Sequence, residues 1–261
     1  MRNRTGEDVN RTIAAYLNRA MDQIVAELDG HIDAETRDRK VSEHYGKTAD
    51  DVRGLLAQGG DLNAIRPRQP DDENDRPLHA LHDLALSCEV PGSVDLAEML
   101  LDGGVNPEIM AEDNSTPLEF ICSANLDTPE ANAFARLLLD HGADPNHQVL
   151  DPADKYRPDN ESSAVRLPPL SRAAFWPLTD RVGIVRVLLD AGADPNLKTV
   201  KGYAPAVFAV HKGKPETLRA LVEAGADLTE GDLRKLKTMG SEEEKAKVRK
   251  ILDEWVPRPA A

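Results

Sequence analysis

The chain has 261 residues and carries 46 acidic and 32 basic side chains, which gives a net charge of −14 at pH 7. Because nucleic acids and anionic membranes are bound mainly through Lys and Arg, this balance argues against both as partners. Aromatic residues make up 4% of the chain, so its core must be built from aliphatic side chains, which suits stacked helices better than a β-sandwich.

Two cysteines, Cys88 and Cys122, are too few for a disulfide framework in a chain of this length, and we expect both thiols to be reduced and buried. The first residues lack the apolar run of a secretory signal, and no stretch approaches the ~18 apolar residues of a membrane span. We therefore expect a cytoplasmic protein that is monomeric on its own.

Apolar residues three or four positions apart predict an amphipathic helix over residues 9–28, and Gly30 is a plausible stop for it. The polar residues 31–40 are interpreted as a turn or linker. Residues 1–40 are thus predicted to form an N-terminal capping helix and its linker, followed by a degenerate first repeat that ends near Asn63.

Two patterns then recur along the chain. Helix-opening segments place a proline, which is preorganised for the first helical turn, before apolar residues. They are Arg76–His82, Thr116–Cys122, Pro168–Ala174 and Ala204–Val210. Helix-closing segments join a Leu-Leu pair, or Leu-Val in the last segment, to a glycine and a polar turn, and they are residues 55–63, 100–107, 138–146, 188–196 and 221–228.

These openers and closers resemble the ankyrin repeat family, whose period is about 33 residues. The likeness is clearest at residues 116–146 and 168–228, and Gly192 and Gly225 are 33 residues apart. Gly142 and Gly192 are 50 residues apart, which places an enlarged finger at residues 147–167. The resemblance implies an all-α solenoid of about five helix–loop–helix units with projecting β-hairpin-like turns over residues 41–229, with helical caps at both ends.

Residues 230–261 are assigned to the C-terminal cap. Ser241 and the glutamates after it fit a capping box, and spaced apolar residues follow up to Trp255. We expect Trp255 to pack on the last repeat.

No arrangement of residues predicts catalysis or a cofactor. His79 and His82 are three residues apart, a spacing that a metal ion could use, but ankyrin-like units use a histidine at the opener position for local hydrogen bonds. The acidic run 71–75 lacks the spaced ligands of a calcium loop. We expect no cofactor and no metal, and an enzyme remains only as a remote alternative whose site forms in the fold.

Ankyrin-like proteins bind partners through their finger tips and the exposed face of each first helix. Carried over by position, the resemblance implies the partner-binding residues Asp72, Glu73, Asp75, Asp83, Glu112, Asp113, Ser123, Phe175, Trp176, Lys201, Tyr203, His211 and Lys212, and we add Tyr156 and Arg157 from the finger. Two interpretations of Phe175 and Trp176 stay open. The preceding insertion folds over and buries them, or they form an aromatic anchor with Tyr203.

The function predicted from the sequence is a non-catalytic protein-binding module. The acidic composition favours a basic partner, and an inhibitor or immunity-type protein is one concrete form of this role. A scaffold or targeting adaptor without inhibitory action is the alternative.

Overall fold

The computed structural model describes residues 5–59, 62–63, 78–111, 114–124, 128–148, 167–176, 179–228 and 242–254. Helices, turns and bends make up these residues without any strand, so the described part of the chain is all-α. The residues group into two compact units. The first unit holds residues 1–120 and 140–142, and the second holds residues 121–139 and 143–261.

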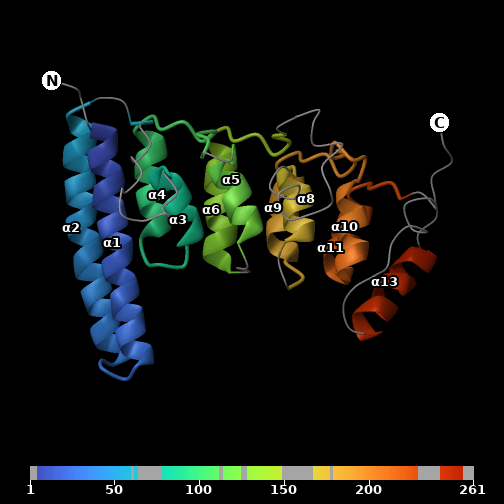
Figure 1. The fold of residues 1–261 in the computed structure, drawn as a ribbon, viewed down its shortest axis with the longest axis horizontal. Helices are drawn as coiled ribbons and strands as arrows, with labels where there is room; N and C mark the ends of the chain where they lie inside the picture. Colours follow the sequence, from blue (N-terminus) through green and yellow to red (C-terminus); the bar gives the residue numbers. More distant parts are fainter. Residues whose placement is uncertain are drawn as a thin grey trace. The chain divides into compact units, whose positions relative to one another are not determined.

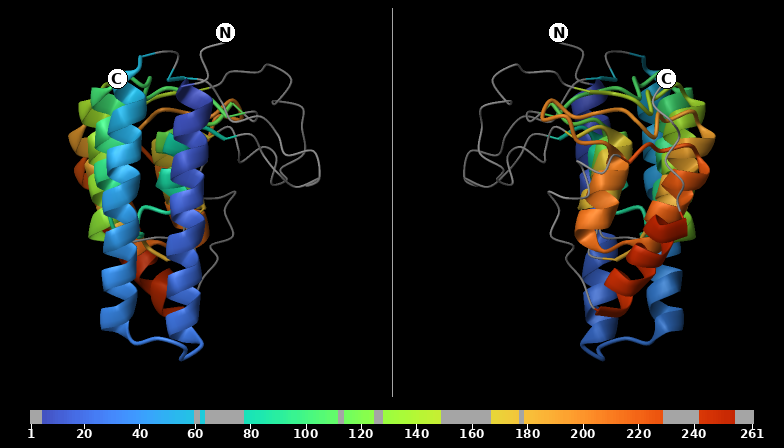
Figure 2. Two further views of the ribbon diagram at one scale, coloured as in Figure 1. Left: turned by 90° about the vertical axis from the view of Figure 1, so that its left-hand side faces the viewer. Right: turned by 90° about the vertical axis from the view of Figure 1, so that its right-hand side faces the viewer.

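A helical hairpin begins the first unit. Helix α1 (Thr5–Leu28) and helix α2 (Ala34–Ala57) run antiparallel and pack on one another (Figures 1 and 2). A stripe of α1 that includes Ile13 and Tyr16 is fully buried. Gly30 takes a φ of 73°, and its N–H donates to the carbonyl of Glu27 at 2.9 Å. The predicted first helix and its glycine stop are therefore confirmed.

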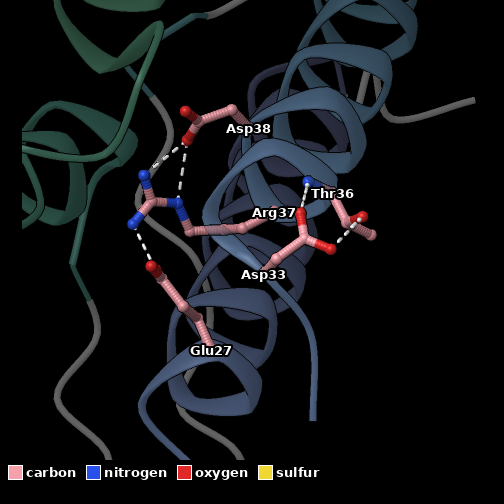
Figure 3. A network of polar contacts seen from close by, with 5 residues as sticks. All are labelled: Glu27, Asp33, Thr36, Arg37 and Asp38. Atoms are coloured by element: carbon pink, nitrogen blue, oxygen red, sulfur yellow. Dashed lines mark hydrogen bonds and ion pairs between the residues drawn. The ribbon is translucent and has the colours of Figure 1, made fainter. Parts of the chain in front are cut away.

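The linker expected at residues 31–40 is wrong beyond its first residues, because α2 already begins at Ala34. Asp33 caps this helix by accepting a hydrogen bond from the Thr36 backbone N–H at 2.7 Å (Figure 3). Arg37 binds the carboxylates of Asp38, beside it on α2, and of Glu27 on α1. The polar residues form the solvent-facing start of a long helix, and this start carries no apolar stripe that could reveal it.

The rest of the first unit packs on the helical hairpin. Helix α3 (Ala80–Leu86) contacts α1 and helix α4 (Ser93–Asp102), and the first residues of α5 (Pro117–Ser123) complete the unit. The side chain of Asn10 accepts a hydrogen bond from the Ala80 N–H at 2.9 Å, and the Tyr16 hydroxyl donates to the carbonyl of Pro91. Gly92, with a φ of 80°, lies directly against the ring of Tyr45.

The second unit stacks short helix pairs. It contains the end of α5, then α6 (Pro129–Asp140), α8 (Pro169–Phe175), α9 (Val182–Asp190), α10 (Pro205–Lys212), α11 (Pro215–Glu223) and α13 (Glu242–Glu254). Helix α8 packs on α9 and α10, while α11 packs on α9, α10 and α13 (Figure 1). The helices predicted after each opener and before each closer are thus present. Trp255 lies outside the described residues.

The core of the second unit is aliphatic, as the low aromatic content predicts. Leu170, Leu188, Val207 and Leu221 are among its buried side chains. Both cysteines of the chain are also buried and form no disulfide, in agreement with the expected reduced thiols. None of the described helices is long and apolar enough to span a bilayer.

A left-handed glycine ends the second helix of each pair. Gly192 has a φ of 88°, and the N–H of Ala193 donates back to the carbonyl of Leu188 at 2.9 Å. This is the Schellman arrangement, in which glycine avoids the strain that a Cβ would add. The glycines at 104, 142 and 225 have φ values of 93°, 94° and 91°, so the closing segments share one geometry.

The asparagine of a closing segment bridges to the next closing segment. In the second unit, the Asn146 side chain accepts a hydrogen bond from the Asp194 N–H at 2.7 Å and donates to the carbonyl of Gly192 at 3.1 Å. Asn196 makes the same two bonds one segment later, at 2.7 and 3.0 Å. The repeated polar turn is therefore a stacking device that fixes the spacing of successive helix pairs.

Candidate protein-binding surface

Eight of the predicted partner-binding residues are described. Asp83 lies half-buried on α3 of the first unit, and the others belong to the second unit: Ser123, Phe175, Trp176, Lys201, Tyr203, His211 and Lys212. Seven predicted residues lie outside the described part of the chain, namely Asp72, Glu73, Asp75, Glu112, Asp113, Tyr156 and Arg157. The partner contacts predicted at the acidic residues 72, 73, 75, 112 and 113 and in the finger insertion therefore stay predictions.

Four aromatic rings gather on neighbouring helices of the second unit. The rings of Phe175 and Trp176, at the end of α8, are 5.6 Å apart between centroids. Phe175 also lies 5.4 Å from Phe208 of α10, and Phe208 lies 6.0 Å from Tyr203. All three contacts are edge-on, the arrangement favoured by aromatic quadrupoles. We call these four residues the aromatic cluster.

Each ring of the aromatic cluster is partly exposed. All four residues are half-buried, in contrast to the aliphatic side chains beneath them. The sequence placed Phe175, Trp176 and Tyr203 together but missed Phe208, because it is not among the positions that the resemblance carries over as partner-binding. One signal could have found it. Phe208 precedes Lys212 by four residues, so both lie on one face of α10.

A tight turn holds Tyr203 beside α10. The N–H of Thr199 donates to the carbonyl of Tyr203 at 2.9 Å, and the Tyr203 N–H donates to the Thr199 hydroxyl at 3.2 Å. Gly202 has a φ of 83° and donates its N–H to the Thr199 carbonyl at 2.7 Å. This turn fixes the tyrosine against Phe208 and leaves Lys201 half-buried at its tip.

Cations lie next to the rings. The Nζ of Lys212 is 4.2 Å from the centroid of the Phe175 ring, within range of a cation–π interaction. Arg172 of α8 is buried, and its Nη1 donates to the Ser123 hydroxyl at 3.2 Å. Ser123, predicted as a partner contact, is thus also engaged with the protein itself. His211 neighbours Lys212 at the end of α10 and is half-buried.

A second polar cluster lies where α11 begins. The carboxylate of Asp180 accepts hydrogen bonds from the backbone N–H groups of Glu216 and Thr217 at 2.6 and 2.9 Å, which caps the helix. The adjacent Arg181 is fully buried and donates from Nη1 to the carbonyl of Ala124. Lys214 is buried as well, and its Nζ has no hydrogen-bond partner among the described residues.

Burial is the main reason that the pKa of Lys214 falls from 10.5 to about 7, since an ammonium group loses its hydration in the protein interior. The carboxylate of Asp180 raises this pKa and so opposes the shift, whereas the charges of Lys212 and Arg181 lower it further. The ammonium and neutral amine forms of Lys214 are therefore similarly populated near pH 7 in the folded protein.

The two histidines considered as metal ligands instead bind the backbone of the first unit. His79 caps α3, where its Nδ1 accepts from the Leu81 N–H at 3.1 Å, and its Nε2 lies 2.8 Å from the carbonyl oxygen of Leu62. The Nε2 of His82 lies 3.1 Å from the carbonyl oxygen of Ser115. Within the described ranges, no group of three or more His, Cys, Asp and Glu side chains could hold a metal ion.

Comparison with known proteins gives one partial likeness. No protein-family model matches the chain. Over 80 residues, or 30% of its length, the chain is 40% identical to the Ankyrin repeat and LEM domain-containing protein 1 homolog of Caenorhabditis elegans. The chain spans about a tenth of the length of that relative. One segment of the chain is therefore similar to a segment of an ankyrin repeat protein.

Proposed function

We propose that this chain is a non-catalytic protein-binding module and that it binds a protein partner through the aromatic cluster. The observation that carries the proposal is the gathering of four rings at the end of α8, on α10 and in the turn before α10, namely Phe175, Trp176, Phe208 and Tyr203. These are four of only ten Phe, Trp and Tyr residues in the chain, and all four are partly exposed. A chain with few aromatics places them together at a surface, where they contribute less to its own core.

Partly exposed rings offer apolar area that a partner can bury. Binding hot spots are enriched in Trp, Tyr and Arg, and a truncated hot-spot side chain costs about 2 kcal/mol or more. The rings also contact one another at 5.4–6.0 Å, so little side-chain freedom remains to be lost on binding. Polar and charged side chains around an apolar centre match the anatomy of a protein interface.

The fold that best serves this function is an ankyrin-like repeat solenoid. Four observations support it: the helix pairs α3–α4, α8–α9 and α10–α11, the shared geometry of the closing glycines, the asparagine bridges, and the partial likeness to an ankyrin repeat protein. In this proposal the α1–α2 hairpin is the N-terminal cap, and α13 belongs to the C-terminal cap. The proposed first repeat begins with α3, since residue 41, the start predicted from the sequence, lies inside the continuous helix α2.

An inhibitor or immunity-type protein and a targeting adaptor would use the same surface. They differ in what happens to the bound partner. An inhibitor abolishes the partner's activity when it binds, and an adaptor leaves that activity unchanged. An activity assay of the isolated complex therefore separates the two roles.

The proposal is tested by affinity capture with matched variants. The full chain, the Phe175→Ala/Trp176→Ala variant and a control variant are each immobilised and exposed to a lysate of the source organism. The control is Leu86→Ala/Met110→Ala, since these apolar side chains of the first unit are 49% and 45% exposed and lie outside the aromatic cluster. It removes a comparable amount of exposed apolar surface elsewhere.

We expect the full chain and the control to capture the same protein, and the cluster variant to bind it at least about 30-fold more weakly. Circular dichroism verifies that each variant is folded. Equal capture by all three proteins would rule out the aromatic cluster as the binding surface. Failure of the folded full chain to capture any protein specifically would count against the binding function itself.

A further inference from the structure

The two segments that carry the aromatic cluster differ in charge from the rest of the chain. Residues 167–176 and 197–213 contain Arg172, Lys198, Lys201, His211 and Lys212 but no aspartate or glutamate. The whole chain has 46 acidic against 32 basic residues, so acidic side chains are otherwise in excess. The rings therefore lie in a locally basic part of an acidic protein.

Basic residues lie in the same segments as the rings. Lys212 reaches over the Phe175 ring with its Nζ at 4.2 Å, and it is half-buried. Lys198 is exposed and directly precedes Thr199, whose backbone and hydroxyl hold the turn of Tyr203, while Lys201 lies within that turn. One ammonium group is thus on a ring of the aromatic cluster, and two further lysines lie in the adjoining turn segment.

Nearby acids of the second unit are engaged by other groups. Asp180 accepts two backbone hydrogen bonds at the start of α11. The Asp194 carboxylate accepts a hydrogen bond from the Asn196 N–H at 2.8 Å, and Glu216 faces Arg219 on α11 at 3.8 Å. These carboxylates stabilise turns and a helix start, and they lie outside the two segments that carry the aromatic cluster.

We propose that the aromatic cluster and its surrounding lysines bind an acidic segment of the partner protein, a run of Asp and Glu that contains an apolar anchor. The inference rests on the proposed function and specifies the partner's chemistry. The anchor packs on the rings, and the carboxylates form charge-assisted contacts with Lys212 and Lys198. A basic segment, which the net charge of the chain would favour, meets like charges at this surface.

A single-stranded nucleic acid would also combine negative charge with surfaces that stack on rings. The protein segment is favoured because the net charge of −14 repels a long polyanion, whereas a short acidic segment interacts mainly with the local lysines. The nucleic acid is therefore an outcome of the test and not part of the proposal.

The experiment selects binders from a displayed random peptide library on the full chain, with counter-selection on the Phe175→Ala/Trp176→Ala variant. Affinities of the selected peptides are then measured by tryptophan fluorescence in a Trp255→Phe background, because the chain has two tryptophans and this change leaves Trp176 as the sole reporter. A labelled oligothymidylate is measured in parallel.

Two charge-reversal variants complete the design. Lys198→Glu/Lys212→Glu changes the proposed site, and Arg136→Glu/Arg186→Glu makes the same net-charge change at exposed positions on α6 and α9. We expect peptides enriched in Asp and Glu around an apolar residue. Their affinity falls about tenfold or more in the lysine variant, falls less in the arginine variant, and weakens with added salt.

Each other outcome overturns the inference in a recognisable way. One such outcome is a set of peptides that need the aromatic cluster and yet show no excess of Asp and Glu, or an excess of Lys and Arg. This result agrees with the proposed binding function but refutes the proposal that the bound segment is acidic. Equal losses of peptide affinity in both charge variants show that the net charge of the chain, and not the lysines near the rings, determines binding. Oligothymidylate that binds and displaces the peptides identifies a nucleic-acid site. A selection that yields no peptide at all refutes the acidic-segment proposal and also counts against the proposed binding function.

Discussion

Lys214 gives a stability prediction that is independent of any partner. This side chain lies between α10 and α11 and is 3% exposed, and burial lowers its pKa to about 7. In the unfolded chain its pKa returns to the ordinary value of 10.5. Between these two values the unfolded state binds more protons than the folded state, so the free energy of unfolding rises with pH from about 7 to 10.5.

The size of this effect follows from the pKa difference. Each pKa unit corresponds to about 1.4 kcal/mol, so the shift from 10.5 to about 7 corresponds to an upper estimate on the order of 5 kcal/mol. Below pH 7 Lys214 is protonated in both states, and the whole penalty for burying the ammonium group is present. At pH 10 the folded protein holds Lys214 neutral, and most of the penalty is gone.

The test is Lys214→Met, which keeps an unbranched apolar stem and removes the charge. We expect the variant to be more stable than the wild type by about 2–4 kcal/mol at pH 6 and by much less at pH 10. Urea unfolding followed by circular dichroism measures the free energy of unfolding of both proteins at both pH values. The variant and the wild type share all other titrating groups, so the pH dependence of their difference reports on Lys214. Lys198→Met, at an exposed position, is the matched control and should show no such pH dependence.

A constant difference between Lys214→Met and the wild type at the two pH values would refute the reasoning. So would a variant that is less stable than the wild type at pH 6. Either result would mean that the ammonium group has stabilising partners in the folded protein that outweigh its lost hydration.

Two further predictions concern the frame of the fold, and urea unfolding measures both. Asn196→Ala removes both bonds to the next closing segment and should lower the unfolding free energy by about 1–2 kcal/mol, while Asn18→Ala, on the exposed face of α1, should change it little. Equal effects would contradict the bridging role. Gly92→Ala should cost at least about 1 kcal/mol, because its φ is 80° and an added Cβ would lie 2.2 Å from the Tyr45 ring. If Tyr45→Ala recovered none of this loss, the ring contact would not be its cause.

Local features of the fold could be predicted because they depend on nearby residues. The glycine stop of the closing segments needs a left-handed residue, and only glycine takes that conformation without strain. Gly192 could therefore be placed at a helix end from its neighbours alone. The bridge from Asn146 to Asp194 could not be predicted in this way, because its two ends are 48 residues apart and meet only after the helix pairs have stacked.

The start of α2 was missed for a related reason. Residues 34–40 carry no apolar stripe, so their sequence looks like a linker. What holds them helical is the Asp33 cap and the pairing of Arg37 with Glu27 of α1, which forms only when the two helices lie side by side. The available sequence signal for the start of α2 was Asp33, a residue type that caps helices, followed by a polar stretch. This signal could be recognised as a helix start only once the packing of α1 on α2 was known.

The candidate site shows the same division between local and whole-chain evidence. The rarity of aromatic residues was enough to single out Phe175 and Trp176, but the partner's charge was inferred from the net charge of the entire chain. Charge acts on a partner over roughly a Debye length of about 8–10 Å, so the side chains near the contact decide the sign that it meets. Around the aromatic cluster, these are Lys212 at 4.2 Å from the Phe175 ring and Lys198 and Lys201 in the adjoining turn. In the proposed complex, a short acidic run with an apolar anchor therefore meets the local lysines and the rings, whereas a longer polyanion also meets the acidic excess of the remaining chain.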